Sequence, residues 1–480
     1  MAVQGVGEKS GPKNELARAS VRRCAMEGEV TAIGEASELP EREALSSSVS
    51  LIPTINVSAT HISPASSLRV DVLWTLAGSV FYTGCQWGCS IAIAKLADSE
   101  ALGQFSLGLA VAAPIFLTGS LQLRGVQATD ARREYSFSDY LSLRIITTVL
   151  AVTLVSLITF GGFTIGSFTR TTALVVLIVG CAKAVESISD IIFGLLQQRE
   201  RMRMIALSMI TKGVGSLILV VAVLSLTKSI VLASSAMLLC WSVVLFSRDI
   251  PNGVAILWDE KRSSDWLSTD TARIAQLFRS SFPLGVMLLL ISLGPAIPRF
   301  FLASSRGLSE LGMYSAISYT IIAGQTVIAA IGQAASPRLS RLFLKGDLSG
   351  YYRLMVRLSA IALCLGILGI AVSVIGGGTI LRLMYAPEYA PYSPCLVVVM
   401  IAALFQYLAT VVEYGVTAAR VFREQVAPAV VALVATSVAA AILIPPYGLM
   451  GGCLVLLVGQ IVTLIGRLFV LWCAIRNGVG

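Results

Sequence analysis

Three charged side chains lie inside one apolar stretch of the chain, at residues 171–196: Lys183, Glu186 and Asp190. Spacings of three and four residues place them on one face of a helix. Each charge costs roughly 2.5–3.5 kcal/mol when it enters hydrocarbon. Two compatible arrangements offset that cost. The charges either pair, Lys183 with Glu186 and Asp190 with Lys212 on the next stretch, or they form the wall of a water-filled cavity.

Further charged groups lie in other apolar stretches of the sequence. They include Glu413 and Arg467, and Arg467 is either a side chain that reaches the membrane interface or the partner of Glu413. Arg299 follows Pro295 and Pro298, and two prolines three residues apart predict a break in the helix that carries them. A broken helix is tolerated at membrane depth where it lines a cavity, and it offers a hinge. Arg299 is therefore either a cavity residue or an interface anchor.

The first apolar stretch contains a group of polar side chains that carry no charge: Tyr82, Thr83, Gln86, Trp87 and Ser90. An aromatic ring beside an amide suits a wall that faces sugar. Ordinary packing of Trp87 is the alternative.

The remaining reactive residue types argue against enzyme chemistry. A single His occurs in 480 residues, outside every long apolar stretch. The nine Cys form no disulfide or zinc pattern, and Cys85 and Cys89 have no accompanying His. The predicted outer loops are short, the longest covering residues 378–392. We predict no catalytic residue, no cofactor and no bound metal.

The elements that position these residues are helices that cross a membrane. Charged residues make up 13% of the chain and apolar ones 56%, and stretches of about 20 apolar residues are long enough to span hydrocarbon. We predict about twelve spans: 72–96, 103–125, 141–162, 171–196, 204–226, 229–247, 279–303, 311–334, 354–377, 393–416, 426–444 and 448–473.

The loop charges predict the orientation of these spans. The net charge of +9 would suggest nucleic acid in a soluble protein, but here the cations lie in short loops. The loops after even-numbered spans, counted with the adjoining span ends and the C-terminus, carry 20 Lys and Arg, and those after odd-numbered spans, counted in the same way, carry 6. The positive-inside rule then places both termini in the cytoplasm.

The chain also repeats itself. The sequence LGQFS at 102–106 returns as LGMYS at 311–315, and the segment 194–199 matches 415–420 with the same Gly-to-Arg spacing. Both matches fall at equivalent places in two sets of six spans. We therefore predict an all-α integral membrane protein of two six-helix lobes, related by a parallel repeat around a central cavity.

Four segments follow from this division. Residues 1–66 form a polar N-terminal tail that cannot bury a core and is predicted to be disordered in the cytoplasm. The N-lobe covers 67–247 and the C-lobe 279–480. Residues 248–278 form a cytoplasmic linker that ends in an amphipathic interfacial helix at 271–278.

Three stretches of the sequence and one loop are distinctive as a set: 102–110 with 121–130, Lys183-Ala-Val-Glu186-Ser187 through Arg201, 297–301 through 336–339, and the loop Ala386-Pro387-Glu388-Tyr389-Ala390. Together they resemble the polysaccharide transporter, or oligosaccharide flippase, family of the multidrug, oligosaccharidyl-lipid and polysaccharide exporter superfamily. The resemblance covers about residues 70–475.

The resemblance implies a multi-pass flippase of the bacterial inner membrane. Such a protein moves an undecaprenyl-diphosphate-linked oligosaccharide by alternating access, for surface polysaccharides such as lipopolysaccharide. Membrane lipids, H⁺ or Na⁺ as a coupling ion and glycan-assembly proteins are its expected partners, and nucleic acid is not. The predicted substrate-cavity residues are Arg299, Lys183, Lys212, Gln86 and Trp87. The predicted charge-pair or coupling residues are Glu186, Asp190 and Glu413.

Other functions remain open at this point. A multidrug-type cation antiporter shares the architecture, but the first three spans contain no buried acid while cations are available in both halves. A lipid II flippase is a closer alternative. A membrane-embedded polymerase or ligase needs a large catalytic outer loop, and a scaffold for glycosyltransferases does not explain costly buried charges.

Overall fold

A computed structural model describes residues 68–130, 133–259, 267–268, 270–419, 421 and 423–477. Within these ranges the regular elements are helices, and no strand occurs. The predicted all-α fold is confirmed. The tail predicted at 1–66 lies outside the described residues.

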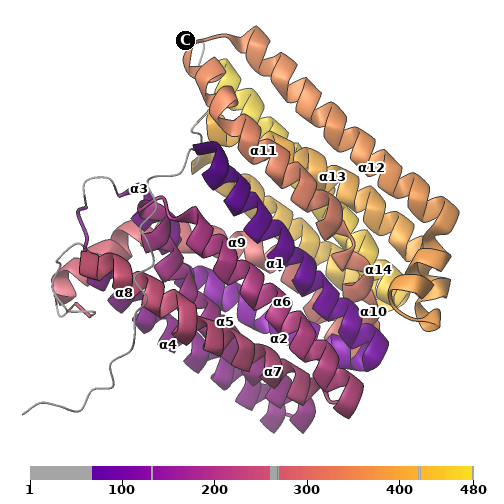
Figure 1. Ribbon diagram of the computed structural model, residues 1–480. Coiled ribbons are helices and arrows are strands. Elements are labelled where there is room, and N and C mark those ends of the chain that lie inside the picture. The colour runs from indigo at the N-terminus through magenta and orange to yellow at the C-terminus, as the bar shows by residue number, and fades with distance from the viewer. Residues whose placement is uncertain are drawn as a thin grey trace, which may run out of the picture. The chain divides into compact units, whose positions relative to one another are not determined.

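Seven helices make up the N-terminal half (Figure 1): α1 (Leu68–Leu96), α2 (Ser99–Ser120), α3 (Leu123–Thr129), α4 (Phe137–Thr164), α5 (Arg170–Gln198), α6 (Met202–Thr227) and α7 (Ile230–Val244). Polar caps fix where several begin. The Asp98 side chain accepts from the Ala101 amide at α2, and Ser136 and Asp139 form a reciprocal capping box at α4.

The C-terminal half consists of α9 (Thr271–Ser305), α10 (Leu308–Tyr319), α11 (Ile321–Leu344), α12 (Leu348–Met384), η2 (Pro387–Tyr392), α13 (Ser393–Ala418), η3 (Arg423–Gln425) and α14 (Val426–Asn477). A non-helical residue, Gly448, with φ 53° and ψ −126°, divides α14 into two helices. This division matches the boundary expected between the last two predicted spans.

The linker predicted at 248–278 is largely helical where it is described. The chain leaves α7 through a π-helical turn, η1 (Leu245–Asp249), and continues as α8 (Ile250–Asp259). Residues 271–278, predicted to form an amphipathic interfacial helix, are the first two turns of α9, and their place at the membrane interface stays a prediction. The Asp270 side chain caps the start of α9, and the helix continues without interruption past residue 278.

The predicted break in the helix beside Arg299 is wrong. Helix α9 runs without interruption through Pro283, Pro295 and Pro298. Proline removes one backbone hydrogen bond, but its fixed φ is helical, and neighbouring helices in a membrane bundle keep such a segment wound. Any hinge near Arg299 must therefore be a bend in a continuous helix.

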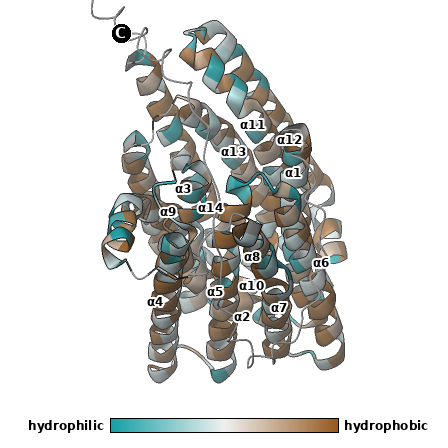
Figure 2. Cartoon of the chain, turned by 60° about the vertical axis from the view of Figure 1, so that its left-hand side comes forward, coloured by the Kyte–Doolittle hydropathy of each residue, from teal (hydrophilic) through white to brown (hydrophobic). Residues whose placement is uncertain are grey.

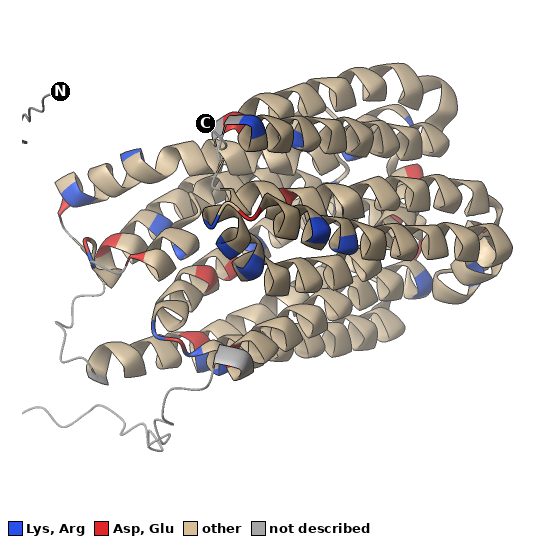
Figure 3. Ribbon diagram, turned by 90° about the horizontal axis from the view of Figure 1, so that it is seen from above, with Lys and Arg blue, Asp and Glu red and all other residues tan. Residues whose placement is uncertain are grey.

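The described helices identify a multi-pass membrane protein. Among the described residues, nine helices are long and apolar enough to cross a membrane. Hydrophobic residues run along most of α4 and α5 (Figure 2), and charged residues are sparse along the helices (Figure 3). Apolar side chains such as Leu157 and Phe160 are exposed, as lipid-facing residues are. Helices occur at all twelve predicted spans, and the number of crossings stays a prediction.

The two copies of the LGxxS sequence lie on α2 and α10, and these two helices pack against each other. The hydroxyls of Ser99 and Ser309, 210 residues apart, are hydrogen-bonded at 2.8 Å. A Cβ on Gly103 would lie 1.9 Å from the carbonyl oxygen of Leu308, and one on Gly312 would lie 1.8 Å from that of Ser99. Gly103 lets α2 approach the start of α10, and Gly312 lets α10 approach the start of α2. This reciprocal contact explains why the LGxxS sequence occurs twice.

Candidate functional site

A cavity of about 570 Å³ lies among α2, α3, α4 and α5, with Leu288 of α9 on its wall. Lys183, Glu186 and Asp190 of α5 all line it. Their common face, predicted from spacing alone, is thus turned toward one space. The cavity is in the volume range of small-molecule sites in proteins.

The predicted pair of Lys183 and Glu186 is confirmed. Lys183 Nζ lies 2.6 Å from Glu186 Oε2, and the Tyr82 hydroxyl donates to Glu186 Oε1 at 2.7 Å. The Lys183 ammonium also lies 5.8 Å from the centre of the Trp241 ring. Both charged side chains keep part of their surface open, 24% for Lys183 and 34% for Glu186, so the pair can still meet a ligand.

The predicted pair of Asp190 and Lys212 is wrong. Asp190 is held between two arginines, with Arg144 Nη2 at 2.9 Å from Oδ2 and Arg124 Nη1 at 3.3 Å from Oδ1. Arg124 also donates through Nε to the Gln197 side chain at 3.1 Å. One carboxylate thus organises two guanidinium groups on the cavity wall.

Lys212 is instead locked in a separate buried pair. Its Nζ lies 2.6 Å from Asp249 Oδ2 and donates to the Ser189 hydroxyl at 2.5 Å. Ser208 donates to the other Asp249 oxygen. Asp249 is the last residue of the π turn, whose wider winding differs from that of an ordinary helix. Lys212 is 3% exposed and does not line the cavity of Lys183.

The lining of the cavity is cationic overall. Three cations, Arg124, Arg144 and Lys183, face two carboxylates, Glu186 and Asp190, which leaves one net positive charge. Arg124 is 32% exposed, whereas Arg144 is almost fully buried and its Nε has no hydrogen-bond partner among the described residues. A planar guanidinium binds phosphate or carboxylate through paired N–H groups, so this wall suits an anion.

Sequence reasoning missed Arg124 and Arg144, because it counted both among the loop charges. A signal was present, however. Arg144 lies inside the predicted span 141–162, where an unpaired arginine would be costly. Its partner could not be found from spacing, since α4 and α5 meet only in the folded bundle.

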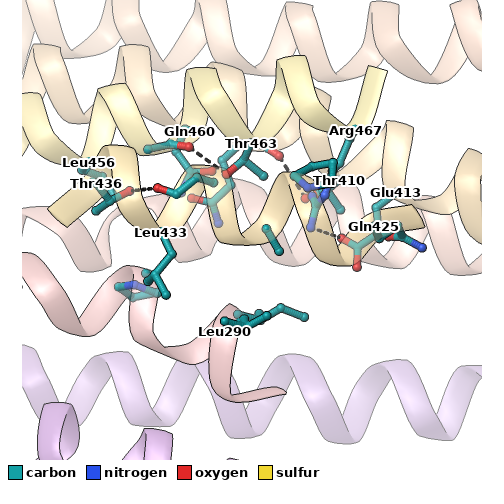
Figure 4. A pocket seen from close by; sticks show the side chains of 18 of the residues that line it. Leu290, Thr410, Glu413, Gln425, Leu433, Thr436, Leu456, Gln460, Thr463 and Arg467 are labelled. Carbon is teal, nitrogen blue, oxygen red and sulfur yellow. Dashed lines mark hydrogen bonds and ion pairs between the residues drawn. The ribbon is translucent and has the colours of Figure 1, made fainter. Parts of the chain in front are cut away.

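A second pocket, of about 300 Å³, lies in the C-terminal half between α9, α11, α13 and α14. Polar side chains including Thr410, Gln460 and Thr463 gather along it, and Leu290 of α9 lies on the opposite side of the opening (Figure 4). Arg467 Nη2 lies 3.0 Å from Glu413 Oε2, which confirms that predicted pair.

The other predicted cavity residues are spread along the chain. Arg299 lies with its guanidinium 5.7 Å from the centre of the Tyr319 ring and does not line the cavity of Lys183. Leu288 marks the cavity on α9, and Arg299 comes eleven residues, roughly 16 Å, further along that helix. Among the described residues, Arg299 is thus not part of the cavity that Lys183 lines, and a central space shared by the two stays a prediction.

The two residues predicted to form a sugar-facing wall have different surroundings. Trp87 Nε1 donates to the Tyr385 hydroxyl at 3.2 Å, and that hydroxyl donates to the Ala316 carbonyl at 2.7 Å. Trp87 thus ties α1 to the end of α12. Gln86 has a buried Nε2 without a hydrogen-bond partner in the described part of the chain.

The described residues contain no cluster of three His, Cys, Asp or Glu side chains that could hold a metal. Eight cysteines are described, and all are free thiols. The chemistry that this arrangement offers is ion pairing, anion binding and hydrogen bonding inside a membrane bundle.

The amino-acid sequence of this helical bundle matches the model of a known protein family. The family model for polysaccharide biosynthesis proteins matches residues 68–343, more than half of the chain, and the chain belongs to this family. The predicted resemblance to polysaccharide transporters is thereby confirmed. The capsular polysaccharide biosynthesis protein CapF of Staphylococcus aureus is 26% identical over 387 residues, which is 79% of this chain and 93% of CapF.

Solved structures share the fold at low identity. The lipid II flippase MurJ, in an inward closed conformation, has a TM-score of 0.68 at 13% identity, over 85% of this chain and 91% of MurJ. An inward-facing multidrug resistance transporter of the MATE family has a TM-score of 0.53 at 14% identity, over 87% and 97%. The fold is thus that of transporters in the superfamily expected from the sequence.

Proposed function

We propose that the protein is a flippase that moves an undecaprenyl-diphosphate-linked oligosaccharide across the bacterial inner membrane, with both termini in the cytoplasm. The observation that carries the proposal is the cationic cavity among α2, α3, α4 and α5. Arg124 and Lys183 are partly exposed there, each oriented by a carboxylate. Such preorganised cations would bind a diphosphate, which is the charged group of the cargo.

The charge balance favours this cargo over an organic cation. A cation antiporter needs a carboxylate that is free to meet its substrate. Glu186 and Asp190 in this cavity are instead occupied by Lys183, Arg124 and Arg144. Lipid II carries the same diphosphate group, so it is the second candidate cargo, supported by the likeness to MurJ.

Transport would proceed by alternating access between the two halves. The α2–α10 contact, with its glycines and the Ser99–Ser309 hydrogen bond, joins a helix of the N-terminal half to one of the C-terminal half. Its separation would open one side of the bundle while the other side closes. H⁺ or Na⁺ as a coupling ion and contacts with glycan-assembly proteins belong to the same proposal.

Translocation in proteoliposomes tests the function. Fluorescent undecaprenyl-diphosphate oligosaccharide, lipid II and a cationic dye are compared as cargoes. We expect Arg124→Gln to slow oligosaccharide translocation by at least about tenfold, because a charge-assisted hydrogen bond contributes roughly 1.5–3 kcal/mol. Arg353→Gln, an exposed arginine of α12, is the matched control. Preference for the dye would refute the proposal, and preference for lipid II would select the second cargo.

Arg299 has a separate test, because it lies apart from the cavity of Lys183. We expect Arg299→Gln to abolish export while the protein still inserts. Normal export by this variant would make Arg299 an interface anchor only.

A further inference from the structure

The pocket of about 300 Å³ in the C-terminal half has a different chemistry from the cationic cavity. Its only charged lining groups among the described residues are Glu413 and Arg467, which neutralise each other at 3.0 Å. The rest of its polar lining consists of amides and hydroxyls: Gln325, Gln406, Thr410, Gln425, Thr436, Gln460 and Thr463. The pocket is therefore polar and uncharged overall.

Two of the four glutamine side chains in this pocket, Gln406 and Gln460, have unused hydrogen-bonding capacity. Gln325 donates to the Thr410 hydroxyl at 3.0 Å, and Gln425 donates to the Val421 carbonyl at 2.7 Å. The side chains of Gln406 and Gln460 make no hydrogen bond with another described residue. A carboxamide offers two donor hydrogens and one acceptor oxygen, and leaving it unsatisfied inside a membrane bundle is costly.

The apolar part of the lining makes the unused amides more informative. Leu290 and Ile291 of α9 and Leu433 and Leu456 of α14 form much of the remaining wall. A site built of mostly apolar walls with a few converging polar groups is the usual form of a small-molecule pocket. Its volume of about 300 Å³ is at the lower end of the range of small-molecule sites in proteins, which suits a small ligand or one part of a larger one.

We propose that this pocket is a saccharide subsite that binds one or two uncharged sugar residues. The proposal rests on the function proposed above, since it assigns the neutral glycan part of the cargo to a place separate from its anionic part. Sugar hydroxyls both donate and accept, which matches the amides of Gln406 and Gln460. Apolar faces of a sugar ring would lie against the leucine wall.

A coupling cation is the main competing occupant of the pocket. A carboxylate strengthens a Na⁺ site, but Arg467 compensates the one carboxylate of this pocket. The same compensation disfavours an anionic sugar, which the cationic cavity would attract instead. The geometry thus points to a neutral saccharide.

Ligand-observed NMR on the whole chain in nanodiscs tests this subsite. The probes are methyl glucoside and N-acetylglucosamine, with inorganic pyrophosphate as the anionic probe in a thermal-shift measurement. We expect saturation transfer to at least one of the two sugars. Gln406→Leu with Gln460→Leu should weaken that sugar's binding by about tenfold, because each change removes hydrogen bonds to its hydroxyls. The pyrophosphate shift should be unchanged.

The matched control is Gln333→Leu, which changes an exposed glutamine on α11 outside the pocket and should leave sugar binding intact. A melting temperature for each variant shows that it is folded, and the single change Gln460→Met replaces the pair if the double variant is not. Equal sugar binding by a folded variant and the native chain overturns the subsite, as does absence of sugar binding altogether. Stabilisation by Na⁺ that disappears in Glu413→Gln, without sugar binding, would make the pocket an ion site instead. Since the assay does not measure translocation, a failure of the subsite and a failure of the flippase function give different results.

Discussion

The glycines at the α2–α10 contact provide a sharp test of how the two halves are held together. A Cβ on Gly312 would lie 1.8 Å from the carbonyl oxygen of Ser99, whereas ordinary contact begins at 3.4 Å. The Gly312→Ala change therefore forces a local separation of about 1.6 Å, the difference of these two distances. The neighbouring atom is backbone, so no flexible side chain can move aside.

The cost of this separation has two parts. Overpacking costs roughly 1–3 kcal/mol. The Ser99–Ser309 hydrogen bond, now 2.8 Å, would stretch beyond its range and forfeit about 1 kcal/mol. Together these shift the equilibrium by about 2–4 kcal/mol against the closed contact, which is on the order of 30- to 1,000-fold.

The assay is disulfide formation between Ser99→Cys and Ser309→Cys in membranes, followed by mass spectrometry of the linked peptides. Because both serines are replaced in this assay, only the overpacking part of the cost acts. We expect rapid cross-linking with native Gly312 and a decrease of about 5- to 150-fold when Gly312→Ala is added. Gly161→Ala on α4 is the control, since a Cβ there meets nothing within 4 Å. Equal cross-linking rates with and without Gly312→Ala would show that this contact does not hold the halves together.

Three further predictions follow from the charges. Glu186→Gln should reduce translocation more than the double change with Lys183→Met, because the single change leaves an uncompensated ammonium; additive effects in a double-mutant cycle would contradict the pairing. Arg144→Gln should lower the free energy of unfolding by roughly 1–3 kcal/mol, because Asp190 then keeps only Arg124 as a charged partner, and an unchanged melting temperature would show that the Arg144–Asp190 pair is dispensable. A reporter fused after residue 477 should behave as cytoplasmic and one near Glu388 as periplasmic, and a periplasmic C-terminus would overturn the topology.

Local properties of the chain were decided by the sequence alone. Apolar stretches of membrane-spanning length foretold where helices lie, because each helix satisfies its own backbone hydrogen bonds. The spacing of Lys183, Glu186 and Asp190 foretold their common face and the first pair, since both are properties of one helix. The LGxxS repeat marks the glycines at which α2 and α10 approach each other, because close helix contacts need glycine at fixed places, and the two equivalent halves that it predicts stay a prediction.

Contacts between distant segments were decided only by the tertiary structure. Asp190 pairs with Arg144 and Arg124 rather than Lys212, because a π turn brings Asp249 to that lysine and α4 packs beside α5. The separation of Arg299 from Lys183 depends on their positions along different helices. The amide-lined pocket combines residues from four helices, and none of the pairwise spacings within one helix encodes that convergence.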